Sequence, residues 1–225
     1  MLAASVFGAF AAFYGVRRNE PRLVRQAPRY ALLAFAGVTL SVVVMQRALI
    51  TRDFSLAYVQ QVGSWSTPAL YNFAAMWSAL EGSILLWTFI LSGFTAVVAW
   101  RYRGRSDHAL VAWAFIVLFV VSAYFALLAI GPADPFAQGP PGVTDGPGPN
   151  PLLQNHILVL FHPPILYLGF VGFTVPFAFA IAALVTGRLG EGWLVETRRW
   201  ALFSWACLTI GILLGGWWSS EVLGW

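Results

Sequence analysis

Two histidines are the residues of this sequence best suited to bind a metal. His156 ends the segment Asn150-Pro-Leu-Leu-Gln-Asn-His156, and His162 lies in the segment Phe161-His-Pro-Pro164. A neutral imidazole among apolar walls is a good axial ligand for haem iron. Six positions turn an α-helix by about 600°, so the two side chains cannot hold one iron from one unbroken helix. At most one of them is therefore a ligand in this chain.

His162 is the stronger candidate because two prolines follow it. Pro163 and Pro164 suit the first turn of a helix, where backbone N–H groups have no partner within the helix to lose. They would fix the imidazole at the entrance of the helix. The alternative is a histidine that caps the helix or bonds a backbone carbonyl, and residue type does not separate the two.

A segment rich in glycine and tryptophan lies near the end of the chain, at Leu213-Leu-Gly-Gly-Trp217-Trp218, with Trp225 as the last residue. The glycines could let a flat ligand approach the backbone, and the indoles could stack on a porphyrin. The alternative is an aromatic belt at the membrane surface.

Charged residues at apolar segments form a third group of candidates. Glu81 lies in Trp77-Ser-Ala-Leu-Glu-Gly-Ser83, where a buried carboxylate needs a proton, a partner or the membrane surface. Helix-end electrostatics explains Glu81 equally well. Arg47 and Arg52 could pair with a ligand carboxylate, although interfacial anchoring or an Arg52–Asp53 pair is the simpler interpretation.

Two further residues are expected to have structural and not chemical roles. His108 lies beside arginines, and Cys207 lies within an apolar run. A single cysteine forms neither a disulfide nor a thiolate cluster within this chain.

The elements that must position these residues are membrane helices. The 225 residues are 59% hydrophobic and 10% charged, with a mean hydropathy of +0.74, far from the roughly 25% charge of soluble domains. The sequence predicts an all-α polytopic transmembrane helical bundle that forms a single membrane unit over residues 1–225. We expect about six spans, at approximately 2–16, 30–50, 72–100, 109–130, 157–186 and 200–218.

Arginine placement predicts the orientation of the bundle. All thirteen basic residues are arginines, and eleven of them follow the first, third and fifth expected spans. The positive-inside rule puts those segments in the cytoplasm and the N-terminus outside. The Pro/Gly-rich segment 131–155 becomes an external loop. Because the arginines form no stripe interleaved with aromatic residues, we expect no nucleic-acid partner.

In combination, these motifs resemble the CcmF/NrfE family of cytochrome c haem lyases. The resemblance rests on Trp77-Ser-Ala-Leu-Glu-Gly-Ser-Ile-Leu-Leu-Trp87, Asn150-Pro-Leu-Leu-Gln, Phe161-His-Pro-Pro and Leu208-Thr-Ile-Gly-Ile-Leu-Leu-Gly-Gly-Trp-Trp218. It runs in register from about residue 50 to Trp225.

The resemblance implies a haem-binding membrane subunit of cytochrome c maturation. Such a protein receives haem from a haem chaperone and attaches it to apocytochrome c through thioether bonds. By position, His162 matches the family's histidine ligand of the haem b iron, and Trp217, Trp218 and Trp225 match the start of the tryptophan segment that presents haem. Glu81 falls in the family's Glu-Gly-Ser motif, without an assigned role. The resemblance also implies a bacterial inner membrane, with the site facing the periplasm.

Two departures from the family pattern qualify this expectation. Leu80 stands where the family often has histidine or glutamine. The sequence also stops at Trp225, where the family continues into further spans and the remaining histidine ligands. We therefore expect a fragment or a split-gene subunit that needs a C-terminal partner and is not a lyase alone.

Two other functions remain open on the sequence. A transporter or channel subunit would need polar residues at mid-membrane depth in several spans, and these are scarce. A purely structural membrane subunit would explain the composition without using any of the motifs.

Overall fold

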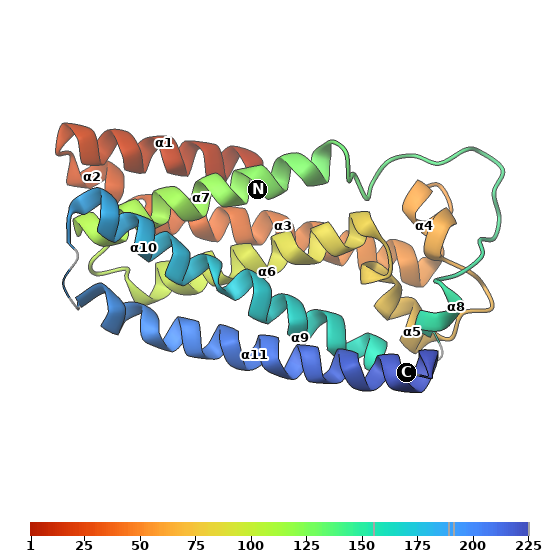
Figure 1. Ribbon diagram of the computed structural model, residues 1–225. Helices are drawn as coiled ribbons and strands as arrows, with labels where there is room; N and C mark the ends of the chain where they lie inside the picture. The colour runs from red at the N-terminus through yellow and green to blue at the C-terminus, as the bar shows by residue number, and fades with distance from the viewer. Residues whose placement is uncertain (155, 189, 191, 225) are drawn as a thin grey trace.

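The computed structural model describes residues 1–154, 156–188, 190 and 192–224, and the named elements within them are helices (Figure 1). This confirms the predicted all-α class. The long helices run side by side, and short helices with an extended loop cover one end of the bundle (Figure 1). The helices are α1 Leu2–Arg18, α2 Pro21–Val24, α3 Ala27–Thr51, α4 Ala57–Val62, α5 Ala69–Ala74, the 3₁₀ helix η1 Ala75–Trp77, α6 Leu80–Arg101, α7 Ala109–Ile130, α8 Pro151–Gln154, α9 Leu158–Gly172, α10 Thr174–Thr186 and α11 Gly192–Leu223.

Within the described residues, five segments are long and apolar enough to cross a membrane, where the sequence predicts about six. They are Pro21–Thr51, Leu80–Arg101, Ala109–Ile130, Leu158–Thr186 and Gly192–Leu223. The difference lies at the first predicted span. The 17 residues of α1 cover only about 25 Å, less than the roughly 30 Å of hydrocarbon.

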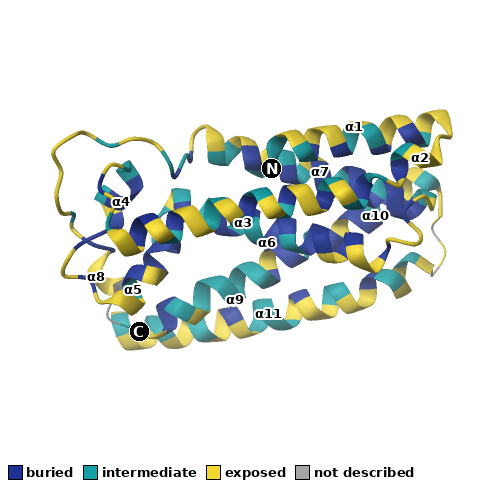
Figure 2. Cartoon of the chain, turned by 180° about the vertical axis from the view of Figure 1, so that it is seen from behind, coloured by how far each residue is buried: buried dark blue, intermediate teal, exposed yellow. Residues whose placement is uncertain are grey.

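The core lies where α3, α6, α7 and α10 meet. Helix α3 packs on α6, α7 packs on both α1 and α10, and α11 packs mainly on α9. Fully buried aromatic side chains such as Phe115, Phe119 and Phe179 fill the interior. Helix α11 keeps most of its surface exposed or half-buried, whereas α6 and α10 show long buried stretches (Figure 2).

The predicted span 72–100 is broken in the structure just before Leu80. Ala79 is extended, with φ −137° and ψ 174°, so α6 begins afresh there. The break is stabilised by side chains that satisfy the carbonyls of the preceding turn. The Tyr58 hydroxyl donates to the Ala75 carbonyl over 2.8 Å and to the Met76 carbonyl over 3.0 Å. Hydropathy cannot reveal this break, because Tyr58 lies on another element.

In its described residues, the Pro/Gly-rich segment contains the short helix α8 and one isolated antiparallel bridge between Gln138 and Leu56, and it is otherwise irregular. It is nevertheless tied to the segment around α4. The Ala57 N–H donates to the Ala137 carbonyl over 2.9 Å, and the Trp65 indole donates to the Thr144 carbonyl over 3.0 Å. The Trp65 backbone N–H donates to Asp145, and this hydrogen bond lowers the pKa of the Asp145 carboxyl. The loop is thus a hydrogen-bonded cover over one end of the bundle.

Candidate functional site

Close helix packing at α9 and α11 builds the surroundings of His162. A Cβ added at Gly169 would lie 2.3 Å from the Leu208 backbone nitrogen, and one at Gly211 would lie 2.7 Å from the Leu166 Cα. Only glycine allows two backbones to approach so closely, as is common between membrane helices. The paired glycines for which the sequence predicts approach of a flat ligand lie further along α11: a Cβ at Gly215 would lie 2.6 Å from the His162 Cε1, and one at Gly216 would meet no atom within 4 Å. Ligand approach at these two glycines stays a prediction.

Close approach at Gly211 gives His162 its hydrogen bond. The Nδ1 atom of His162 lies 2.8 Å from the Gly211 carbonyl oxygen. Since a carbonyl only accepts, Nδ1 carries the hydrogen and donates it. The Nε2 atom then keeps its lone pair, and it has no hydrogen-bond partner within the described residues. A histidine that donates one ring N–H to a carbonyl and offers the other nitrogen is the usual arrangement for a metal ligand.

The two prolines after His162 lie deeper in the helix than predicted. Helix α9 begins at Leu158, so Pro163 and Pro164 stand inside it instead of in its first turn. Pro163 has no N–H to donate to the Val159 carbonyl four residues earlier. The Trp77 indole donates to that carbonyl instead, over 2.8 Å. A tryptophan of the broken span thereby stabilises the helix that carries His162.

His162 lines a pocket of about 400 Å³ between α9, α11 and the start of α6. This volume is within the usual range for small-molecule sites. Trp218 lies on one side, with its ring centre 5.7 Å from that of His162 and the two planes at 50°. The other side chains lining the pocket are mostly apolar or aromatic, among them Trp77, Leu80, Leu166 and Tyr167.

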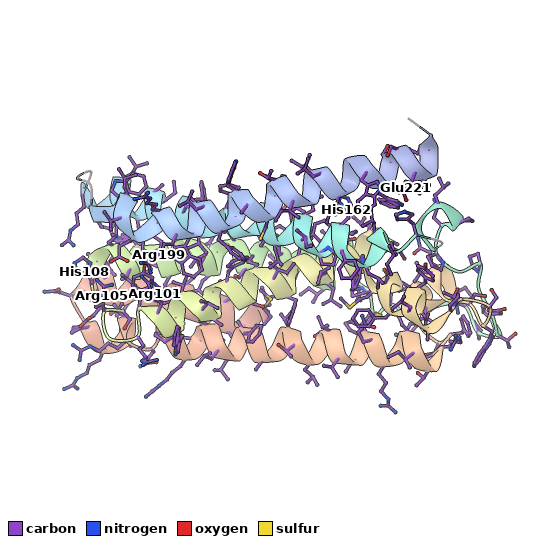
Figure 3. The ribbon with its side chains drawn as sticks, turned by 90° about the horizontal axis from the view of Figure 1, so that it is seen from below. Arg101, Arg105, His108, His162, Arg199 and Glu221 are labelled. Carbon is purple, nitrogen blue, oxygen red and sulfur yellow. The ribbon has the colours of Figure 1, made fainter. Side chains whose placement is uncertain are left out.

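His156 has a different environment, which separates the two histidines. Its Nδ1 accepts the Leu158 N–H over 3.2 Å, so its Nε2 carries the hydrogen. Nε2 is paired with the Glu221 carboxylate near the end of α11. Both nitrogens of His156 are therefore engaged, whereas His162 keeps one nitrogen available. Figure 3 shows His162 and Glu221 in the same end of the bundle.

The predicted tryptophans separate in the structure. Trp218 is half-buried beside His162, and its indole Nε1 is buried without a hydrogen-bond partner within the described residues. Trp217 is 56% exposed, and its indole donates to the Glu221 carboxylate. Trp225 lies outside the described residues. Trp218 thus faces the pocket, and Trp217 faces the surroundings of the bundle.

The Glu-Gly-Ser motif lies at the start of α6 and joins the pocket to the helix break. A Cβ at Gly82 would lie 1.8 Å from the Met76 carbonyl oxygen and 2.3 Å from the Tyr58 hydroxyl, so only glycine fits. Ser83 donates to the Trp77 carbonyl over 3.0 Å and accepts from the Tyr167 hydroxyl over 3.3 Å. Glycine and serine therefore have packing roles that the sequence does not reveal.

Glu81 lies in the first turn of α6, where a carboxylate complements the helix dipole. One of its oxygens, Oε2, is buried without a hydrogen-bond partner within the described residues. This position fits both predicted alternatives, helix-end electrostatics and a ligand contact.

Of the remaining polar candidates, Arg52 and His108 have structural partners, and Arg47 is exposed. Arg52 donates to the Ser64 and Thr67 carbonyls and lies 4.9 Å from the centre of the Trp65 ring. No ion pair joins Arg52 and Asp53 in the described part of the chain. His108 lies 2.8 Å from Arg188, measured between Nε2 and an arginine nitrogen.

Polar side chains buried within the spans give little support to a transport path. Thr88 and Thr95 on α6 donate to carbonyls four residues earlier in the same helix. No group of three or more metal-ligating His, Cys, Asp or Glu side chains occurs in the residues described.

Replacing Gly215 by alanine should displace His162. The new Cβ would lie 2.6 Å from the His162 Cε1, so the imidazole must move and its bond to Gly211 weakens. We expect a loss of about 2 kcal/mol in stability, measured by thermal unfolding in detergent. Gly216→Ala is the control, because nothing lies within 4 Å of its added Cβ. Equal losses in the two variants would contradict this packing.

Comparison with known families agrees with the resemblance found in the sequence. A family model described as cytochrome C assembly protein matches residues 77–225. The cytochrome c-type biogenesis protein CcmF of Escherichia coli (strain K12) is 39% identical over 213 residues, which cover 94% of this chain and 33% of that protein. CcmF of Pseudomonas fluorescens is 43% identical over 198 residues, covering 88% of this chain and 29% of that protein.

A solved structure also matches. The structure titled cytochrome c heme lyase CcmF aligns with a TM-score of 0.87 and 36% sequence identity, covering 100% of this chain and 35% of that one. The probable biogenesis protein NrfE of Escherichia coli (strain K12) is 38% identical over 218 residues, covering 95% of this chain and 38% of that protein. The chain spans about a third of the length of the relatives it matches.

Proposed function

The chain belongs to the cytochrome c assembly family, and on that premise we propose that it is a haem-binding membrane subunit of cytochrome c maturation. We propose the Nε2 atom of His162 as an axial ligand of a haem b iron. This proposal rests first on the hydrogen bond from His162 Nδ1 to the Gly211 carbonyl, which leaves Nε2 with a free lone pair at the edge of a pocket.

The residues around His162 suit a haem. Trp218, Trp77 and Tyr167 give the pocket aromatic walls, against which a porphyrin would pack. The buried indole N–H of Trp218 has no partner in the described residues and would donate to a polar group of a ligand. A bound haem b would supply a redox-active iron held by an imidazole. The protein's own part is to fix the imidazole tautomer and to offer aromatic side chains that pack against the porphyrin.

Glu81 and Trp217 have accessory roles in this proposal. The unpaired Oε2 of Glu81 would accept a hydrogen bond from a polar group of a ligand beside the pocket. Trp217, held by Glu221, would face the haem that is transferred. The site lies at the end of the bundle opposite the arginines Arg101, Arg105 and Arg199 (Figure 3), so the positive-inside rule directs it to the periplasm.

The chain is a multi-pass membrane protein, and its bacterial relatives favour a bacterial inner membrane. We propose that a haem chaperone and other cytochrome c maturation components deliver haem, and that apocytochrome c receives it. Covalent attachment would need the parts of the relatives that this chain does not cover, in the same polypeptide or in a C-terminal partner.

The test is the haem content of the detergent-purified chain, expressed with ample haem, alone and together with the part of a CcmF relative that this chain does not cover. We expect a Soret band and a pyridine haemochrome spectrum of the b type in the combined sample. Absence of haem from both samples would contradict the proposal and leave a structural membrane subunit as the better account.

A further inference from the structure

A second pocket lies between α6 and α11, at the opposite end of the bundle from His162. It is a groove of about 400 Å³ that opens to the outside. Phe94 forms the floor of this groove. Its ring centre lies 6.2 Å from those of Trp200 and Phe203. The walls are Phe94, Val97, Trp100, Trp200 and Phe203.

The groove faces the surroundings of the bundle, not its core. Val97 is 47% exposed, Trp100 is 67% exposed and Phe203 is 49% exposed. Both flanking helices are long and apolar enough to cross a membrane, so in a bilayer these side chains would face lipid. An apolar groove at this position would hold an acyl chain at little cost in desolvation.

Two arginines stand at the end of the groove, Arg101 at the end of α6 and Arg199 near the start of α11. Figure 3 places them near each other, in the end of the bundle that also carries Arg105 and His108. Arg199 forms no ion pair within the described residues. Arg101 lies over the Tyr102 ring, 5.8 Å from its centre. Both guanidinium groups are exposed, and they can turn toward a ligand.

Glu196 also lines the groove, but its charge is already compensated. One carboxylate oxygen accepts the Tyr102 hydroxyl over 2.7 Å, and the other accepts from Arg105 over 3.1 Å. Arg101 and Arg199 therefore leave an excess of positive charge at the mouth of the groove.

The geometry points to a binding site for an anionic phospholipid. Arg101 and Arg199 contact the phosphate, and one acyl chain lies along Phe94, Val97 and Phe203. Guanidinium groups pair well with phosphate oxygens, and basic pockets between membrane helices suit anionic headgroups. Trp100 and Trp200 flank the position expected for the glycerol region, where indoles are favoured. The apolar walls select a lipid over a free phosphate ion.

Native mass spectrometry of the purified full chain tests this inference. The chain is mixed with phosphatidylglycerol or with phosphatidylcholine of the same acyl chains, and the bound lipids are counted after the detergent is removed. We expect one phosphatidylglycerol to be retained preferentially. Arg101→Gln combined with Arg199→Gln should reduce its occupancy about tenfold, because two charge contacts near an anionic headgroup are lost.

The matched control is Arg17→Gln combined with Arg18→Gln. It removes the same charge from the end of α1, whose arginines lie over Phe13 and Tyr14 and do not line the groove. The control should keep the lipid. Equal losses in both double variants, or equal retention of phosphatidylcholine, would overturn the inference.

Two further experiments identify what binds in the groove. Glycerol 3-phosphate in excess should not displace the lipid, and displacement would show a site for a free phosphate ester. The chain combined with the part of a CcmF relative that it does not cover should still retain the lipid. Exclusion of the lipid from that complex would overturn the inference and identify the groove as a protein contact.

Discussion

Gly82→Ala is expected to destabilise the protein by about 3 kcal/mol or more, since an added methyl group overpacks a site that cannot yield. The nearest atom to the new Cβ is the Met76 backbone carbonyl oxygen, at 1.8 Å, and the Tyr58 hydroxyl follows at 2.3 Å. Moving that carbonyl breaks its bond with Tyr58. Thermal unfolding of the detergent-solubilised chain measures the loss.

Gly93→Ala provides the control within the same helix. Its added Cβ would lie 3.6 Å from the nearest atom, on Phe35, which is an ordinary contact. Because alanine favours helix over glycine, this variant should be neutral or up to about 1 kcal/mol more stable. Comparable unfolding temperatures for the two variants would show that Gly82 has no special packing role.

Hydropathy predicts the long helices well, because a bilayer requires about twenty apolar residues in succession. The predicted stretches at 30–50, 109–130 and 157–186 correspond to α3, to α7 and to the pair α9 and α10. The last of these is interrupted at Phe173, near Pro176, whose missing N–H leaves the Gly172 carbonyl unpaired in the helix.

Contacts between distant segments limit what the sequence can predict at the site. The hydrogen bond between His162 and Gly211 joins residues 49 positions apart, and no local sequence pattern predicts it. Doubled glycines in the sequence suggest open space, yet Gly215 is covered by the imidazole and only Gly216 is open. The resemblance to a haem lyase family is confirmed, whereas the roles of His162, Trp217, Trp218 and Glu81 stay predictions.

His162→Asn is expected to reduce bound haem about tenfold or more, the largest functional effect we predict, because an iron ligand is lost. The asparagine amide can still donate a hydrogen bond toward Gly211, so the fold is better preserved than with alanine. His162→Ala should lose haem to the same extent. Haem per chain is measured by pyridine haemochrome after expression with the part of a CcmF relative that this chain does not cover.

His156→Ala is the matched histidine control. Both of its ring nitrogens are engaged, by Leu158 and Glu221, so the variant should retain haem. Loss of haem from His156→Ala with retention in His162→Asn would reverse the assignment of the ligand.

The most direct test of the central claim is the optical spectrum of His162→Gly, co-expressed with the part of a CcmF relative that this chain does not cover, with and without imidazole. Free imidazole can enter the space that the side chain leaves and offer the same nitrogen to iron. We predict that the b-type spectrum is lost without imidazole and returns when imidazole is added. An unchanged b-type spectrum in His162→Gly without imidazole would contradict His162 as the haem ligand.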